Sequence, residues 1–198
     1  MRVAVCVSGR GSNLRALVAA LGPADGARVV LVISNRADAG AIEYARSVGI
    51  QTAVLDQPAS GAEWLEHLGQ WDIDFVVLAG FLKRVPNEVV AAYRGRIINI
   101  HPALLPKFGG PGMYGLNVHR AVLAANEAES GATVHLVTEA YDEGPILGQG
   151  RVPVRADDTP ESLAHRVLDI EHQLLPAAVR AAAAVGRAVP FTMNAGKP

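Results

Sequence analysis

Two polar side chains, Asn99 and His101, lie two residues apart inside an otherwise apolar run near the middle of the chain. Alternate residues of a β-strand point to the same face, so a strand would present both together while Ile98 and Ile100 face the other way. An asparagine amide can donate a hydrogen bond to a developing oxyanion, and a histidine can exchange a proton near neutral pH. The spacing predicts either an acid–base site or a hydrogen-bonded pair that closes a strand end.

A glycine-rich segment, Ser8-Gly9-Arg10-Gly11-Ser12-Asn13, follows the first apolar run. Free N–H groups at the start of a helix carry partial positive charge and can hold a phosphate, and glycine lets the backbone approach the ligand closely. The glycine spacing fits neither a Walker A loop nor the dinucleotide-binding fingerprint. The segment is therefore either a phosphate site of another kind or an ordinary strand-to-helix turn.

A carboxylate, Asp142, lies in the loop Tyr141-Asp142-Glu143-Gly144-Pro145. A carboxylate beside an imidazole fixes its tautomer and stabilises its charged form. Sequence spacing does not show that Asp142 reaches His101, and by itself Asp142 reads as a turn residue.

The elements that would position these residues alternate along the chain, since short apolar runs are each followed by a stretch with helical spacing. This alternation predicts an α/β fold, with a Rossmann-like, mostly parallel twisted sheet covered by helices on both faces. No linker or repeat interrupts it, so we expect a single domain over residues 1–198. The expected strands are Val3–Val7, Val29–Ile33, Thr52–Leu55, Phe75–Ala79, Arg96–Ile100, Ala132–Val137 and Ile146–Val154. We expect a side-chain cap from Ser12 or Asn13 on the first helix, and from the segment starting at Asp158 a long capped helix to about Val185.

Composition excludes several classes of function. Apolar residues make up 50% of the sequence, charged residues 19%, and the formal net charge is −1 with no basic run, so we expect no nucleic-acid partner. No apolar stretch is long enough to span a bilayer, so no membrane association is expected. Cys6 is the only cysteine and lies in an apolar run. With no signal-peptide pattern at the start, the sequence predicts a cytoplasmic protein.

Four segments together resemble the folate-dependent formyltransferases in order and spacing: RVAVCVSGRGSNLRAL, VVLAGFLKRV, INIHPALLP and SGATVHLVTEAYDEGPIL. The resemblance runs from residue 1 to about 180. Within the family, the SGRGSN loop resembles the members that act on glycinamide ribonucleotide. The members that act on methionyl-tRNA carry an added basic domain, and the deformylases carry a regulatory domain, for neither of which we expect room here.

The resemblance implies transfer of the formyl group of 10-formyltetrahydrofolate, a co-substrate, to the amine of glycinamide ribonucleotide in de novo purine synthesis. It implies no metal, a monomer or homodimer, an N-terminal half (about 1–95) that binds the nucleotide phosphate, and a C-terminal half (about 96–198) with the catalytic residues and a folate-site loop. Two alternatives stay open: another amine acceptor, such as a nucleotide-linked amino sugar, and a non-catalytic binding module on the same fold.

Site residues carried over from the family fall into three groups. The catalytic residues are Asn99, His101 and Asp142. The ribonucleotide phosphate and ribose are assigned to Gly11, Ser12, Asn13 and Glu171. The folate is assigned to Leu82, Lys83, Arg84, Val85 and Asn99, and Leu105-Pro106 resembles a cis-proline turn of the family.

The sequence departs from the family pattern at two places. Gly61 stands nearest to a position where one common form of the enzyme has a basic residue that meets the glutamate tail of the folate. The loop Lys107–Val118 is longer than the compact form, and we interpret it as a variant that flanks the site. His119 after this loop is expected either to touch ligand or to serve as a cap or surface residue, and His135 to be a buried supporting residue.

Overall fold

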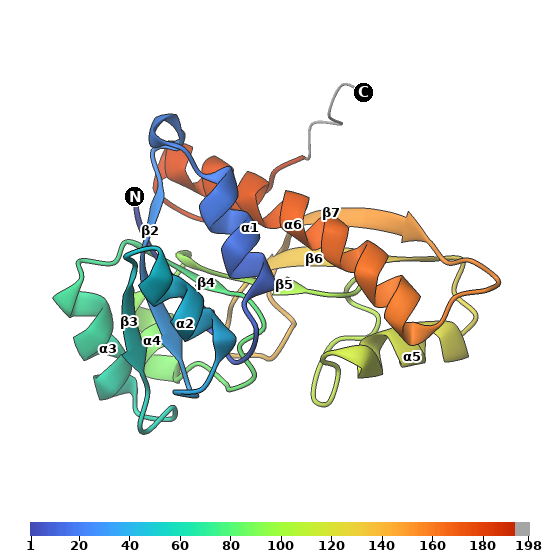
Figure 1. Cartoon of the computed structure of the whole chain (residues 1–198), viewed down its shortest axis with the longest axis horizontal. Helices are drawn as coiled ribbons and strands as arrows, with labels where there is room; N and C mark the ends of the chain where they lie inside the picture. The colour runs from blue at the N-terminus through green and yellow to red at the C-terminus, as the bar shows by residue number, and fades with distance from the viewer. Residues whose placement is uncertain (193–198) are drawn as a thin grey trace.

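A computed structural model describes residues 1–192 as one seven-stranded sheet with helices on both faces (Figure 1). The strand order is β3-β2-β1-β4-β5-β6-β7. Strands β1 to β5 pair in parallel, whereas β6 and β7 are antiparallel additions at one edge. The strands are β1 (Arg2–Val7), β2 (Arg28–Ser34), β3 (Gln51–Val54), β4 (Phe75–Leu78), β5 (Ile97–His101), β6 (Glu129–Leu136) and β7 (Ile146–Pro153). The last six residues of the expected domain lie outside the described part of the chain.

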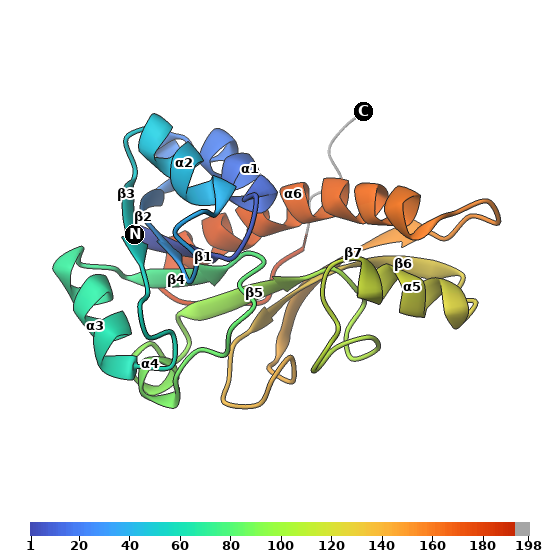
Figure 2. The same ribbon diagram turned by 60° about the horizontal axis from the view of Figure 1, so that its bottom comes forward.

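Helices cover the two faces of the sheet unequally (Figure 2). Apolar residues of α1, α2, α5 and α6 form one buried cluster with the sheet, and those of α3 and α4 form a second cluster on the opposite face. Both faces of the central strands are therefore buried, which explains why β1 and β4 are continuous apolar runs. The helices are α1 (Ser12–Ala20), α2 (Gly40–Ser47), α3 (Gly61–Gln70), α4 (Asn87–Ala92), α5 (Leu116–Ala124) and α6 (Pro160–Val185), with a short 3-10 helix at Pro23–Asp25.

The long helix α6 begins as the sequence predicts. Thr159 is its N-cap, the Thr159 hydroxyl accepts a hydrogen bond from the N–H of Ser162, and Pro160 occupies the first turn. The start of α1 is different. Its N-cap is Gly11 and no side chain caps it, so the predicted cap from Ser12 or Asn13 is wrong. The first N–H groups of α1 are thus left without a side-chain partner, and the Asn13 side chain turns toward α6 instead.

Two further features complete the fold. Helix α4 was not expected from the sequence, because six residues after Pro86 are too short to show a helical period. The Leu105–Pro106 peptide bond is cis, as the family resemblance implies. Within residues 1–192, no helix combines the length and the apolar character that crossing a bilayer requires.

Candidate active site

The predicted site residues gather at the carboxyl ends of β1, β4 and β5. From β1 the chain adds β2 and then β3 on one side, and it then returns to add β4 on the other side of β1. The order in which strands are added therefore reverses between β1 and β4, although the two strands are parallel. In open α/β sheets this reversal leaves a crevice where ligands bind. The Ser8 hydroxyl joins the segments that follow β2 and β4, since it donates to Asn35 Oδ1 at 2.6 Å and accepts from the Leu82 N–H at 2.8 Å.

Gly11 forms the turn from β1 into α1. Its φ is +77°, a left-handed conformation that favours glycine, and a Cβ at this position would lie 2.6 Å from the Cβ of Ala41. The close approach of α1 to α2 therefore requires a residue without a side chain here. The uncapped helix start that follows has the N–H groups and the dipole that attract an anion.

A buried polar pair joins α1 to α6. Asn13 Nδ2 donates to Glu171 Oε2 at 2.6 Å, and both side chains are largely excluded from solvent. Burial raises the pKa of Glu171 to about 7, although the hydrogen bond from Asn13 acts in the opposite direction. Asn13 Oδ1 is buried and has no partner in the described residues. This pair brings two predicted ribonucleotide residues, from opposite ends of the sequence, to one place.

Asn99 is held by a histidine on the neighbouring strand. The amide Nδ2 of Asn99 lies 3.0 Å from Nε2 of His135, and His135 Nδ1 lies 3.0 Å from the carbonyl oxygen of Leu136. A carbonyl oxygen only accepts, so Nδ1 carries the proton of a neutral His135 and Nε2 accepts from the Asn99 amide. The other N–H of that amide remains available to a ligand. The sequence indicated only that His135 is buried; its contact with Asn99 depends on the pairing of β5 with β6.

His101 is anchored by the loop that follows it. Its Nε2 donates to the carbonyl oxygen of Phe108 at 2.8 Å, which leaves Nδ1 directed toward Asp142, whose Oδ2 is 3.8 Å away. Burial lowers the pKa of His101 below its ordinary value, an effect that the Phe108 carbonyl and Asp142 only partly offset. The imidazole is therefore neutral at pH 7, and Nδ1 is the nitrogen free to gain and lose a proton.

Asp142 completes this cluster from the loop between β6 and β7. Its φ is +57°, and its Oδ2 accepts a hydrogen bond from the N–H of Gly110 at 2.9 Å. The other carboxylate oxygen lies 3.5 Å from His135 Nε2. Burial would raise the pKa of Asp142, but the hydrogen bond from Gly110 and the nearby His101 act in the opposite direction and the pKa is lowered, so Asp142 is ionised at neutral pH. The carboxylate thus lies between two histidines, with the predicted partner His101 within ion-pair distance.

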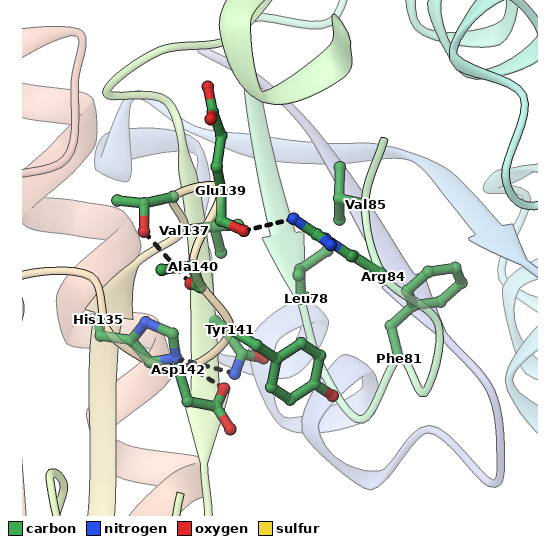
Figure 3. Close-up of a pocket in the computed structure, with 12 residues that line it drawn as sticks. Leu78, Phe81, Arg84, Val85, His135, Val137, Glu139, Ala140, Tyr141 and Asp142 are labelled. Carbon is green, nitrogen blue, oxygen red and sulfur yellow. Dashed lines mark hydrogen bonds and ion pairs between the residues drawn. The ribbon is translucent and has the colours of Figure 1, made fainter. Parts of the chain in front are cut away.

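One cavity of about 320 Å³ connects these groups. Its lining includes predicted residues of all three kinds: Ser12, Asn13, Leu82, Asn99, His101, Asp142 and Glu171. A smaller cavity of about 40 Å³ adjoins it and shares Phe81, Asn99, Tyr141 and Asp142 (Figure 3). Arg84 and Val85 line only this smaller cavity, whereas Gly11 and Lys83 line neither.

His119 is a cavity residue that the sequence left undecided. It lies inside α5 rather than at its cap, is 4% exposed, and lines the larger cavity. Of the two roles that the sequence left open, the cap or surface role is therefore excluded. Burial lowers the pKa of His119 to about 4, helped by the nearby His101, so it is neutral at pH 7. The only advance signal was its position directly after the long loop.

The two departures from the family pattern have structural counterparts. Gly61 begins α3 and is buried, and a Cβ there would lie 3.0 Å from the Glu88 side chain, so this position offers no cation to a ligand. The long loop supplies the Phe108 carbonyl and the Gly110 N–H, both used by the site. Among the residues described, no cluster of histidine, cysteine and carboxylate side chains has the geometry to hold a metal ion.

Comparison with known proteins identifies the family. Residues 1–179 match the family model described as formyl transferase. A phosphoribosylglycinamide formyltransferase of Arabidopsis thaliana, named as chloroplastic, is 49% identical over 87% of this chain and 62% of its own length. The Escherichia coli protein of that name is 38% identical over 89% of this chain and 84% of its own. The chain spans about three fifths of the length of the Arabidopsis and Vigna unguiculata relatives.

Solved structures agree in fold as well as in sequence. A phosphoribosylglycinamide formyltransferase from Brucella melitensis superposes with a TM-score of 0.84 at 44% identity, covering 92% of this chain and 95% of that one. One from Bacillus halodurans superposes with a TM-score of 0.85 at 32% identity, covering 96% of this chain and all of that one. The predicted α/β fold class is confirmed, and this chain belongs to the formyl transferase family.

Proposed function

We propose that this chain transfers the formyl group of 10-formyltetrahydrofolate to the amine of glycinamide ribonucleotide, giving N-formylglycinamide ribonucleotide and tetrahydrofolate in purine biosynthesis. The observation that carries the proposal is that one cavity holds an amide donor, a neutral histidine and an ionised carboxylate beside an uncapped helix start. The names of the relatives support the same reaction. The fold supports one domain whose two halves contribute different parts of the cavity.

The ribonucleotide is assigned to the α1 side of the cavity. The N–H groups that follow Gly11 suit a phosphate, because no side chain in the described residues caps them and they lie at the positive end of a helix dipole. Glu171 and Asn13 present a carboxylate and an amide on the same side, and both line the cavity. Hydroxyl groups of a ribose can donate to a carboxylate, which accounts for a polar pair at this depth.

The folate is assigned to the β4 side, where the lining suits a flat, partly apolar molecule. Phe81 follows β4, and Tyr141 lies beside it in the small cavity, on the loop that carries Asp142 (Figure 3). Leu82 and Tyr141 both line the larger cavity. Leu82 and Tyr141 are exposed apolar side chains at this cavity, a feature typical of a binding surface. With the folate ring on this side, the formyl carbon of the donor would lie between Asn99 and His101, the groups that can act on it.

The chemistry requires a place for one negative charge and a route for one proton. Attack of the substrate amine on the formyl carbon forms a C–N bond and places charge on the former carbonyl oxygen. The second N–H of the Asn99 amide, fixed by His135, can donate to that oxygen. His101 accepts a proton at Nδ1 from the attacking amine, assisted by the ionised Asp142, and returns it to the departing nitrogen as the old C–N bond breaks.

The test is a spectrophotometric assay of deformylated folate, with a 10-formylfolate donor and the purified chain, with and without glycinamide ribonucleotide. Release that depends on the ribonucleotide supports the proposal. Release with no amine present would indicate a deformylase, and release only with a different acceptor, such as an amino sugar nucleotide, would overturn the assigned acceptor. Binding of folate with no release under any condition would overturn catalysis.

A further inference from the structure

Arg84 lines the small cavity and joins two of the segments around it. Its side chain extends from the segment after β4, and its Nη2 donates to the carbonyl oxygen of Glu139 at 2.7 Å (Figure 3). Glu139 lies in the loop between β6 and β7, so the bond joins two segments that are far apart in the sequence. An arginine fork gives a directional hydrogen bond to a carbonyl oxygen, which a more apolar residue at this position would lack.

The loop between β6 and β7, which carries Glu139, forms few other hydrogen bonds. Its ends are fixed, because the Val137 N–H donates to Ile97 and the Leu136 N–H donates to the carbonyl oxygen of Pro145, each at 2.9 Å. Between these ends, residues 138–141 make one hydrogen bond to another element in the described part of the chain, and its donor is Arg84. This segment directly precedes Asp142.

The cavity under the bond is too small for the ring system it would receive. Its volume is about 40 Å³. One buried water needs roughly 10–15 Å³ by this measure, so the space holds on the order of three waters. A two-ring heterocycle is larger than that. Either the β4 side or the loop must move for such a ring to enter, and the buried Phe81 and Val85 make the β4 side the more rigid wall.

We propose that the hydrogen bond from Arg84 to Glu139 is a clasp that closes the heterocycle pocket, and that a ring enters only when the clasp opens. The identity of the ring as a folate rests on the proposed function; the clasp itself does not. Arg84 thereby controls access of the formyl donor and holds the segment that leads to Asp142. A ligand that binds only the open state binds more slowly and more weakly by the fraction of time the clasp is open.

The expected size of the effect follows from the kind of bond. A guanidinium–carbonyl hydrogen bond between exposed groups is worth about as much as an ordinary hydrogen bond, because solvent screens its charge. Arg84→Met, which keeps the aliphatic stem and removes the donor, should raise the open fraction about two- to tenfold. Arg84→Lys keeps the charge but not the fork and should lie between. Arg155→Met is the matched control, since Arg155 is exposed and its side chain forms no hydrogen bond in the described residues.

The first measurement is amide hydrogen exchange of residues 138–141 in the ligand-free protein, with circular dichroism to verify folding. Exchange in Arg84→Met should be two- to tenfold faster than in the wild type and in Arg155→Met, with the core strands unchanged. The second is stopped-flow binding of tetrahydrofolate, whose association rate should rise by the same factor, because both rates depend on the same opening.

Each outcome decides a separate question. Unchanged exchange in Arg84→Met would overturn the clasp. Faster exchange with slower or weaker tetrahydrofolate binding would overturn control of access and make Arg84 a direct ligand contact. If the wild type does not bind tetrahydrofolate at all, the proposed function fails, while the exchange result still decides whether the clasp exists.

Discussion

Replacement of the buried Glu171 by glutamine should make the protein more stable at high pH and change little at low pH. The pKa of Glu171 is raised from 4.5 to about 7 in the folded protein, mainly by burial. Below pH 4.5 the carboxyl is protonated in both the folded and the unfolded chain, and its contribution to stability is fully present. As the pH rises through 7, this stability is lost, because ionisation is more favourable in the unfolded chain.

The magnitude follows from the two pKa values. A tenfold change in an ionisation constant corresponds to 1.4 kcal/mol, so full ionisation of Glu171 costs the folded state about 3 kcal/mol. At pH 5 the cost is less than about 1 kcal/mol, since the pH is only half a unit above the unfolded pKa of 4.5 and the folded carboxyl is still protonated. Glu171→Gln keeps an oxygen that can accept from Asn13 but cannot ionise. Its stability relative to the wild type should therefore rise by about 2 to 3 kcal/mol between pH 5 and pH 8.

The assay is urea unfolding of both proteins at several pH values from 5 to 9. Other groups with shifted pKa values, such as His101 and Asp142, titrate in both proteins alike, so the difference between variant and wild type isolates Glu171. Glu66→Gln, at an exposed position, is the control for the loss of one carboxyl group from the chain. A flat difference for Glu171→Gln would refute the argument, since Glu171 would then be ionised without cost.

Three further predictions concern the catalytic cluster and the glycine turn. Asn99→Ala should lower kcat on the order of a hundredfold, the effect of removing one oxyanion donor, in a protein with a native circular dichroism spectrum; a kcat close to wild type would exclude Asn99 from the reaction. Asp142→Asn should lower kcat and move the acid limb of the pH–rate profile to lower pH, because losing the nearby anion lowers the pKa of His101 further; an unmoved limb would mean that Asp142 has only a structural role. Gly11→Ala should destabilise the protein by at least about 1–2 kcal/mol in urea unfolding, because a left-handed φ of +77° is strained for alanine and its Cβ would approach a side chain of α2 to 2.6 Å. The KM for the ribonucleotide should then rise more than the KM for the donor, and equal changes in both would argue against a phosphate site at this turn.

Local patterns in the sequence were sufficient for most of the framework. Buried strands such as β1 and β4 are uninterrupted apolar runs, and α6 carries its own start signal at Thr159, so nearest neighbours in the sequence specify them. The features that failed are those without a local signal. The six residues of α4 are too few to show a period, and the predicted cap on α1 did not form because the Asn13 side chain found a partner on α6.

The candidate site likewise has features that the sequence predicted and features that depend on tertiary contacts. Residue types and spacing predicted Asn99 and His101 as chemically capable groups, whereas Asp142 by itself had the pattern of a turn residue. The family resemblance assigned catalytic roles to all three, and these roles stay predictions. Their mutual arrangement depends on pairings between distant segments, which spacing along a chain does not encode. The antiparallel alignment of β5 with β6 puts His135 against the Asn99 amide, and the long loop delivers the Phe108 carbonyl to His101.

The sequence by itself determined the order of the strands and of the longer helices along the chain, the glycine that the first turn requires and the groups able to exchange protons. Only the tertiary structure decided which ring nitrogen of His101 is free, that Glu171 is buried with a pKa near 7, and that Arg84 joins two segments around the small cavity. The physical reason is that periodicity and turn chemistry act between near neighbours, whereas burial, protonation and cavity shape depend on which distant segments come into contact.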